Sequence, residues 1–285
     1  MIKKVIDDFS IEQICDSGQC FRMSKISHPD FGTCVEVIAG GRYLIVCQEG
    51  REAYFDCSER EYEEFWKGYF DIDSATDYGK IKASIDPEDS YLNNAAEFGY
   101  GIRILNQDPW EMIISFIISQ RNNIKRIRGC IARLCEKYGE KKTALNEDGT
   151  VKTDADGNEI VYYDFPRPEV LAAVDVSDLK ALGVGYRDVY IKKAAEAVML
   201  KEIDVDAISK MNYEESREEL LKLYGVGGKV ADCICLFALH HTDAFPRDTH
   251  IISIVDNEYG GEFPFDKYPG YAGVLQQYMF FYDLK

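Results

Sequence analysis

The chain has 285 residues, enough for one large or two modest domains with hydrophobic cores. Its 46% hydrophobic and 29% charged residues are typical of a globular protein, and no apolar run reaches the ~18–20 residues of a membrane span. The net charge of −17 by itself argues against a nucleic-acid partner, because phosphate binding needs a basic surface. We expect a cytoplasmic protein, since the N-terminus leads into acidic residues and not into a signal segment.

The nine cysteines are scattered, odd in number and nowhere spaced Cys-x-x-Cys. This spacing predicts neither disulfides nor a zinc site. We therefore expect most of them to be small buried side chains in a reducing compartment. They are Cys15, Cys20, Cys34, Cys47, Cys57, Cys130, Cys135, Cys233 and Cys235.

The first hundred residues are predicted to begin with β-structure. Four strand-like segments are separated by turn residues, and Gly40-Gly41 and Glu49-Gly50 supply hairpin turns, which indicates an antiparallel meander. Aromatic side chains at helical spacing then predict a helix over residues 59–70. The expected strands cover residues 21–23, 34–39, 42–48 and 52–55.

A helical region follows. Asp108, Pro109 and Glu111 are typical of a helix start, with a cap, a proline at the first position and a glutamate at the third. After a polar break at 119–123, residues 121–137 carry six basic side chains and one acidic side chain. Because charges more than ~8 Å apart are largely screened, this basic helix outweighs the net charge and restores nucleic acid as a partner.

Residues 140–163 have the composition of an inserted surface hairpin. Turn-rich runs at 147–149 and 154–158 precede a segment, 160–163, that could pair back as a strand. The Asp-x-Asp-Gly run suggests calcium, but an EF-hand loop has glycine at its sixth position and glutamate at its twelfth. This chain has Glu159 and Phe165 there.

The rest of the chain is predicted to be helical from Pro166 on, with helices over 177–182, 188–200 and 271–282. Its most informative stretch is 212–250. Asn212 and Glu215 form a capping box, the glycines of 225–228 end the first helix, and Lys229 opens a second helix. Asp248 stands where its side chain would cap a further helix begun by His250.

Exposed backbone N–H groups at such a glycine hairpin make a phosphate site without basic side chains. An ordinary glycine-linked helix pair with a solvated lysine is the alternative for an isolated Gly-x-Gly. Here the whole stretch resembles the helix-hairpin-helix, Gly/Pro-Asp signature of the DNA glycosylase superfamily, including the lysine after the hairpin and the aspartate nineteen residues later.

Further segments resemble 8-oxoguanine DNA glycosylase in the same order along the chain. They are SGQCFR (17–22), NQDPWEMIISFIISQRNNIKRI (106–127), YYDFP (162–166), LGVGYR (182–187) and YGVGGKVADCICL (224–236). The resemblance implies an α+β fold, with an N-terminal antiparallel β-sheet domain over residues 1–104. A mostly α-helical HhH-GPD glycosylase domain would follow over 105–285, with the hairpin insertion near 140–163.

The resemblance also implies an activity, the excision of 8-oxoguanine with accompanying abasic-site lyase activity. Lys229 would be the nucleophile and Asp248 would assist electrostatically and in proton handling. The flipped base would lie between Cys233 and Phe280. Gln276 would read its Watson–Crick edge, and the Gly18 carbonyl would accept the N7–H that guanine lacks.

DNA contacts are implied outside this pocket. Arg126 and Arg187 match the arginines that read the opposite cytosine, and Tyr186 matches the wedge that fills the gap. Arg121 stands where animal members of the family have asparagine, which leaves the strictness of opposite-cytosine preference open. Further expected contacts to DNA are Asn122, Gly225, Gly227 and His250.

The implied partner is duplex DNA containing 8-oxoguanine, bound by a monomer. No cofactor and no side-chain metal site is expected, although hairpin backbone carbonyls could hold a structural cation. No cysteine follows Cys235, which weighs against the iron–sulfur centre of related glycosylases. Two alternatives stay open: a glycosylase of this superfamily for another damaged base, and a non-catalytic helix-hairpin-helix module that binds DNA.

Overall fold

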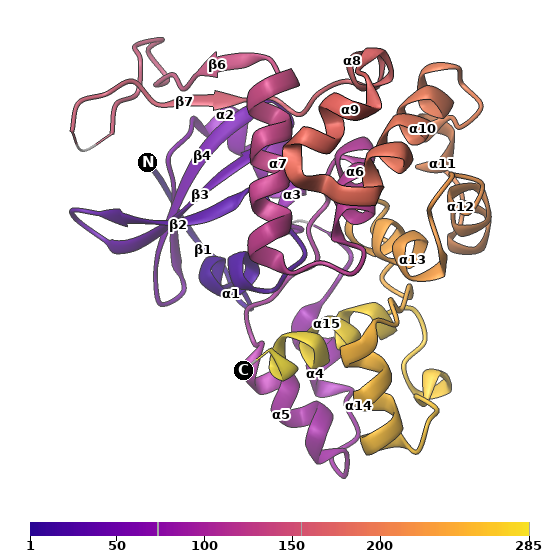
Figure 1. The fold of residues 1–285 in the computed structure, drawn as a ribbon. Helices are drawn as coiled ribbons and strands as arrows, with labels where there is room; N and C mark the ends of the chain where they lie inside the picture. The colour runs from indigo at the N-terminus through magenta and orange to yellow at the C-terminus, as the bar shows by residue number, and fades with distance from the viewer. Residues whose placement is uncertain (73, 155, 285) are drawn as a thin grey trace.

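The structure is a computed structural model that describes residues 1–72, 74–154 and 156–284. Ala155, within the predicted insertion, lies outside the described residues, as do Asp73 and Lys285. A β-sheet and its covering helices form one side of the molecule, and helical layers form the other (Figure 1). No helix within the described ranges has the length and apolarity to cross a membrane. The α+β class is confirmed.

The N-terminal sheet is antiparallel and five-stranded, in the order β1-β5-β4-β3-β2. The predicted meander is confirmed, although β2 begins two residues later than expected. Strand β1 was not predicted; it is a four-residue edge strand that pairs with β5, and its Lys4 also makes an ion pair with Glu59. The strands are β1 (Ile2–Val5), β2 (Met23–His28), β3 (Gly32–Ala39), β4 (Arg42–Glu49) and β5 (Glu52–Phe55).

Cys34 and Cys47 form a disulfide, so the expectation that no disulfide forms was wrong. The two residues are directly opposite in the β3–β4 ladder, with Cα atoms 4.3 Å apart. Sequence spacing alone does not show this proximity. It does follow from the hairpin, because a turn centred on Gly40-Gly41 places residue 34 opposite residue 47.

This disulfide should be detectable chemically. Alkylation of the unfolded, unreduced protein should label the seven free cysteines and no others, as read from the intact mass. Adding a dithiol reductant should label all nine and lower the free energy of unfolding by ~3 kcal/mol, because the unfolded chain loses a short closed loop. A Cys57→Ala control should keep the reductant-dependent difference. Nine labelled cysteines in the unreduced wild-type protein would contradict the pairing.

One face of the sheet is covered by helix α1 (Ile11–Asp16) and by residues 59–69. The predicted helix at 59–70 is confirmed as a continuous helical segment with a π-helical turn inside it. Phe55, Trp66 and Phe70 are fully buried there. The segment consists of α2 (Glu59–Glu61), the π-turn η1 (Tyr62–Trp66) and α3 (Lys67–Tyr69).

The remaining chain is mostly helical and shares one large hydrophobic core. Helices α4 and α5 precede residue 105 in the chain, but their buried side chains join the core of the later helices. The boundary expected after residue 104 stays a prediction. The helices are α4 (Tyr78–Ala83), α5 (Ser90–Phe98), α6 (Pro109–Ser119), α7 (Ile124–Tyr138), α8 (Pro168–Ala173), α9 (Val176–Leu179), η2 (Lys180–Val184), η3 (Gly185–Arg187), α10 (Asp188–Met199), α11 (Val205–Ile208), α12 (Tyr213–Leu220), α13 (Gly228–Phe237), α14 (Thr249–Tyr259), η4 (Phe265–Lys267) and α15 (Ala272–Asp283).

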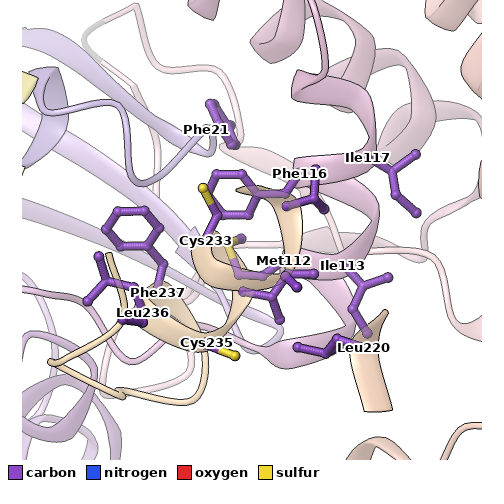
Figure 2. Close-up of a cluster of buried hydrophobic side chains, with 14 of the residues drawn as sticks. Phe21, Met112, Ile113, Phe116, Ile117, Leu220, Cys233, Cys235, Leu236 and Phe237 are labelled. Carbon is purple, nitrogen blue, oxygen red and sulfur yellow. The ribbon is translucent and has the colours of Figure 1, made fainter. Parts of the chain in front are cut away.

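Helix α6 lies at the centre of this core. Its side chains are buried from Trp110 to Ile118, so it is hydrophobic on all sides. The Phe116 ring stacks on Phe237 of α13 with centroids 5.6 Å apart, and both rings lie within the apolar cluster of Figure 2. The predicted start of α6 is confirmed, since the Asp108 carboxylate accepts the Glu111 N–H at 2.7 Å.

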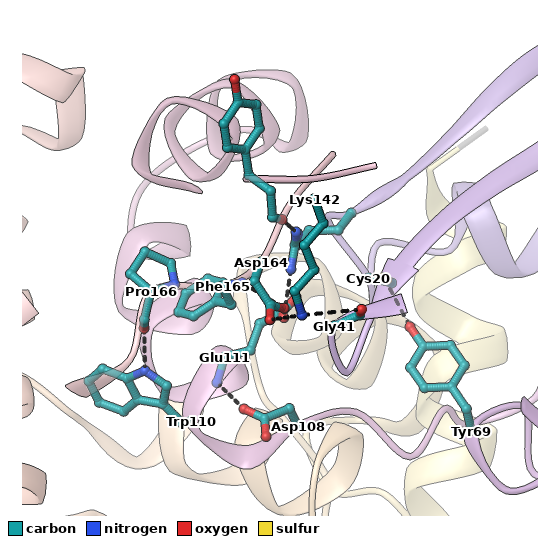
Figure 3. Close-up of polar contacts among 12 residues, drawn as sticks. Cys20, Gly41, Tyr69, Asp108, Trp110, Glu111, Lys142, Asp164, Phe165 and Pro166 are labelled. Atoms are coloured by element: carbon teal, nitrogen blue, oxygen red, sulfur yellow. Dashed lines mark hydrogen bonds and ion pairs between the residues drawn. The ribbon is translucent and has the colours of Figure 1, made fainter. Parts of the chain in front are cut away.

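Buried polar contacts join α6 to the sheet domain (Figure 3). The Arg22 guanidinium lies 3.1 Å from the Glu111 carboxylate, with both side chains buried. Burial raises the pKa of Glu111, and the positive charge of Arg22 opposes that rise. The Trp110 indole donates to the Pro166 carbonyl at 2.8 Å. The Arg22–Glu111 ion pair thus connects the segment at residues 17–22 to α6, and the Trp110 hydrogen bond connects α6 to the segment before α8.

The insertion is a hairpin, as predicted. Strand β6 (Lys141–Thr143) pairs with β7 (Val161–Tyr163) in antiparallel register. The buried Lys152 ammonium lies 2.7 Å from the Asp56 carboxylate, which anchors the insertion on the sheet domain. The insertion therefore packs on the side of the sheet and projects away from the glycine hairpin (Figure 1).

Candidate active site

The glycine hairpin joins α12 and α13 as predicted. Asn212 and Glu215 form the reciprocal capping box of α12. Gly225 has φ +85°, and a Cβ atom there would lie 2.4 Å from the Tyr190 ring, so only glycine fits this reversal. Helix α13 starts at Gly228, one residue earlier than expected, because Gly227 provides its N-cap.

Six of the residues predicted for catalysis and base binding line one pocket. They come from four separate parts of the chain: the turn between α1 and β2, helix α13, the loop before α14, and α15. Four further residues complete the wall: Phe116, Phe237, Pro246 and Gln277. The six are Gly18, Lys229, Cys233, Asp248, Gln276 and Phe280.

Lys229 is the amine of this pocket. It stands one helical turn before Cys233 on the same face of α13, and its Nζ lies 5.5 Å from the centroid of the Phe116 ring. Burial raises the pKa of the Cys233 thiol to about 11, against the lowering effect of the neighbouring Lys229. The thiol is therefore protonated near neutral pH and is a poor nucleophile there.

Asp248 caps a helix and also lines the pocket. Its carboxylate accepts the Ile251 N–H at 2.9 Å and caps α14, as predicted. The helix itself begins at Thr249, one residue before the expected start. The cap holds a negative charge at the helix N-terminus, where the helix dipole stabilises it. That charge lines the same pocket as Lys229.

Gln276 and Gly18 form the part of the pocket wall that is suited to binding a base. Gln276 is only 4% exposed, and its Oε1 has no hydrogen-bond partner among the described residues. A buried amide oxygen without a partner is costly, so this atom is suited to a donor on a bound ligand. Gly18 has φ +77°, and a Cβ atom there would lie 3.1 Å from the Phe280 ring.

The residues predicted to contact the opposite base lie outside this pocket, on two adjoining turns. Tyr186 is 51% exposed, and Arg126 is exposed on the first turn of α7, with one hydrogen bond of 3.3 Å to the Gly183 carbonyl. Arg187 is different: it is 4% exposed, and its Nε donates to the Gln120 carbonyl at 2.9 Å. Its guanidinium therefore braces the turn before α7.

The turn that Arg187 braces presents two other predicted contacts. Arg121 is exposed and has φ +46°, a left-handed conformation that is uncommon for a non-glycine residue. Asn122 donates to the Ile118 carbonyl at 3.0 Å, so it ends helix α6. Arg187 also donates to the Arg121 carbonyl at 3.2 Å, which supports this conformation.

The exposed His250 contacts Phe280, one of the residues that line the pocket. Its Nδ1 is 2.6 Å from the Asp283 carboxylate, and its ring meets the edge of Phe280 at 5.7 Å. Asp283 and the four additional wall residues were not predicted. Phe116 and Phe237 belong to periodic helix faces and Pro246 to a loop. Their sequence pattern therefore indicates only that they are part of the hydrophobic core. Gln277 gave no signal apart from its position next to Gln276.

Comparison with known proteins identifies the family of this chain. Residues 1–113 match the N-terminal domain of 8-oxoguanine DNA glycosylase, and residues 114–261 match the HhH-GPD superfamily of base excision DNA repair proteins. The chain is 36% identical over 170 residues to N-glycosylase/DNA lyase of Saccharomyces cerevisiae, a match that covers 56% of this chain. It spans 42% of the length of that yeast relative.

Two solved structures are similar over nearly the whole chain. Clostridium acetobutylicum 8-oxoguanine glycosylase/lyase in its apo form has a TM-score of 0.84 and 33% identity, covering 98% of this chain and 94% of that one. The same enzyme with double-stranded DNA containing cytosine opposite 8-oxoG has a TM-score of 0.84 and 32% identity, covering 97% and 92%. The chain therefore belongs to the HhH-GPD superfamily of base excision DNA repair proteins, and within it to the 8-oxoguanine DNA glycosylase family.

Proposed function

We propose that this protein is a bifunctional DNA glycosylase/lyase that removes 8-oxoguanine from duplex DNA in base excision repair. The observation that carries the proposal is the meeting of an amine and a carboxylate, Lys229 and Asp248, with base-recognition groups in one pocket. The complex of the clostridial glycosylase/lyase with DNA containing cytosine opposite 8-oxoG supports the same substrate.

In the proposed reaction the damaged nucleotide leaves the duplex and enters the pocket. The neutral Lys229 amine attacks the anomeric carbon while the glycosidic bond breaks and the base departs with the bonding electrons. The Asp248 carboxylate stabilises the positive charge that develops on the sugar. The attached nitrogen loses a proton, the sugar C1′–O4′ bond opens and O4′ takes up a proton, which leaves a protonated imine between lysine and sugar. Loss of a proton from the neighbouring carbon then expels the 3′ phosphate, and this β-elimination breaks the strand.

Base choice would be made by the opposite wall. Cys233 and Phe280 would hold the two faces of the base, and Gln276 would bind its Watson–Crick edge. The Gly18 carbonyl would accept the N7–H that 8-oxoguanine has and guanine lacks. A buried donor or acceptor without its partner costs ~1–3 kcal/mol, so one such contact favours the lesion clearly over guanine.

DNA would be held on the surface around the pocket. The hairpin amides at Gly225 and Gly227 would bind phosphate, as would His250. Tyr186 and Arg121 would enter the space left by the flipped base, with Asn122 beside them. Arg187 would reach the opposite base only if it released the carbonyls it now binds, so Arg126 is the better placed of the two arginines.

Replacing Arg126 with alanine should weaken the preference for cytosine opposite the lesion. We expect the ratio of excision rates opposite cytosine and opposite adenine to fall about tenfold, because one good contact to a base edge contributes ~1–3 kcal/mol of discrimination. Single-turnover excision from duplexes with each opposite base measures it. Lys125→Ala, on the exposed neighbour, is the control and should slow all pairs equally. If Arg126→Ala instead slowed excision equally opposite cytosine and opposite adenine, Arg126 would be a phosphate contact.

The proposed chemistry uses an amine and a carboxylate of the chain itself, so it requires no cofactor. A structural cation at the hairpin would use backbone carbonyls. The Leu223 and Gly225 carbonyls each accept one hydrogen bond, at 3.0 Å, which leaves each a lone pair for such an ion. The protein would act as a monomer in the cytoplasm, at the nucleoid in a bacterium.

Borohydride trapping tests the proposal directly. The protein is incubated with a duplex that carries one 8-oxoguanine opposite cytosine, and borohydride reduces the imine to a stable amine. We expect a covalent protein–DNA adduct and, without borohydride, base release with strand cleavage. No adduct would overturn the lyase chemistry. Activity on other lesions but not on 8-oxoguanine would favour another glycosylase, and no nicking of abasic DNA would favour a non-catalytic module.

A further inference from the structure

Three consecutive backbone carbonyls in the turn at residues 17–19 differ in their partners. The Ser17 carbonyl accepts from the Gln277 side-chain amide at 2.6 Å, and the Gln19 carbonyl accepts from the Gln107 side-chain amide at 2.9 Å. The Gly18 carbonyl between them has no partner among the residues that the structure describes. Gly18 lines the pocket. Of the three, the Gly18 carbonyl is thus the one available to accept a hydrogen bond from a ligand.

The two side chains that bind the flanking carbonyls are themselves held firmly. Gln277 is 2% exposed and Gln107 is 5% exposed. Gln107 Nε2 is also 3.3 Å from the Phe237 carbonyl at the end of α13, the helix that carries Lys229. Breaking either hydrogen bond would leave a backbone carbonyl without its partner, and Gln277 would also lose the partner of its buried amide, so these hydrogen bonds resist breaking.

The turn is also fixed from within by the buried Gln19. Its side-chain amide donates to the Arg103 carbonyl at 2.9 Å and accepts the Leu105 N–H at 2.9 Å. Each peptide group is planar and turns as a unit, so holding the groups on both sides restricts the group between them. The Gly18 carbonyl can then change direction only if one of these hydrogen bonds breaks.

We infer that Gln277 and Gln107 are positioning residues that keep the Gly18 carbonyl directed at the base, and so set the discrimination between 8-oxoguanine and bases without an N7–H. This inference rests on the proposed function and adds two residues to it. An acceptor that is oriented before binding spends no free energy on reorganisation when the base arrives. Gln276 and Gln277, adjacent on α15, would then divide the work between the base and the turn that reads it.

Binding to two matched duplexes tests the inference. One carries 8-oxoguanine, and the other carries 7-deaza-8-oxoguanine, in which carbon replaces N7 and the N–H donor is absent. Dissociation constants are measured in the Lys229→Gln background, so that neither duplex is cleaved. We expect this background protein to bind the first duplex about tenfold more tightly, and Gln277→Met to reduce that ratio to about twofold. Methionine has a similar length and no amide.

Two further variants complete the experiment. Gln107→Met should reduce the ratio in the same way, which keeps the test open if Gln277→Met fails to fold. Gln13→Met is the matched control, because the Gln13 amide holds the Phe98 carbonyl at 2.9 Å and Gln13 does not line the pocket, and it should leave the ratio unchanged. Equal weakening of both duplexes in the Gln277 and Gln107 variants, or no weakening, would overturn the inference. A background protein without preference would instead overturn the proposed function.

Discussion

Lys229→Gln should abolish the borohydride-trapped adduct and lower excision of 8-oxoguanine by at least about 10³-fold in kcat, as expected when a nucleophile is removed. The glutamine amide cannot form an imine, so β-elimination should be lost together with base release. The measurements are denaturing gel electrophoresis of the trapped complex and single-turnover release of the base. Binding to 8-oxoguanine DNA should persist, because the substitution leaves the proposed recognition groups, Gly18, Cys233, Gln276 and Phe280, in place.

The control for this variant is Lys222→Gln, which removes an exposed lysine shortly before the glycine hairpin. Lys222 makes an ion pair with Glu219 on the surface, so its loss should change neither the adduct nor the unfolding transition. An adduct of normal yield in Lys229→Gln would place the nucleophile elsewhere. Loss of the adduct in both variants would point to a general effect of charge on DNA binding.

Asp248→Asn should separate the two roles of Asp248. Asparagine is as good an N-cap as aspartate, so the hydrogen bond to the Ile251 N–H and the stability of α14 should be kept. The negative charge in the pocket is lost, and we expect base release to slow by ~10²–10³-fold, the usual cost of removing one electrostatic group that stabilises a transition state. Single-turnover kinetics and urea unfolding of the same preparation measure both effects.

Asp248→Ala provides the comparison. It removes both the charge and the cap, so it should slow base release to a similar extent and lower the free energy of unfolding by ~1 kcal/mol. An Asp248→Asn protein with normal base release would reduce Asp248 to a helix cap. If Asp248→Asn lost as much stability as Asp248→Ala, part of the measured decrease in base release would come from unfolding of the protein.

Local features of the chain could be predicted because their causes are local. The capping box at Asn212 and Glu215, the start of α6 at Asp108, and the reversal at Gly225 each depend on a few neighbouring residues. The hairpin turn at Gly40-Gly41 also depends on neighbouring residues. Its register places Cys34 opposite Cys47, which would have predicted their disulfide. Strand β1 was missed because its contacts, the pairing with β5 and the ion pair of Lys4 with Glu59, are with residues distant in the chain.

Other features were decided by the tertiary structure. Arg187 matched a base-reading arginine in sequence, yet the packing of two turns buries its guanidinium against backbone carbonyls. Helices α4 and α5 follow the sheet in the chain, but their apolar faces pack in the core of the later helices. Gln277 could not be selected in advance, because its partner, the Ser17 carbonyl, is distant in the chain.

The amino-acid sequence predicted the chemistry that we propose for the chain, through a lysine after a glycine hairpin, an aspartate at a helix cap, and the segments that resemble the family. Only the tertiary structure decided that Gly18, Lys229 and Gln276 line one pocket and that two glutamines hold the turn beside it. The physical reason is range. Caps and turns are set by hydrogen bonds between near neighbours, whereas a pocket forms where distant segments bury their apolar faces together.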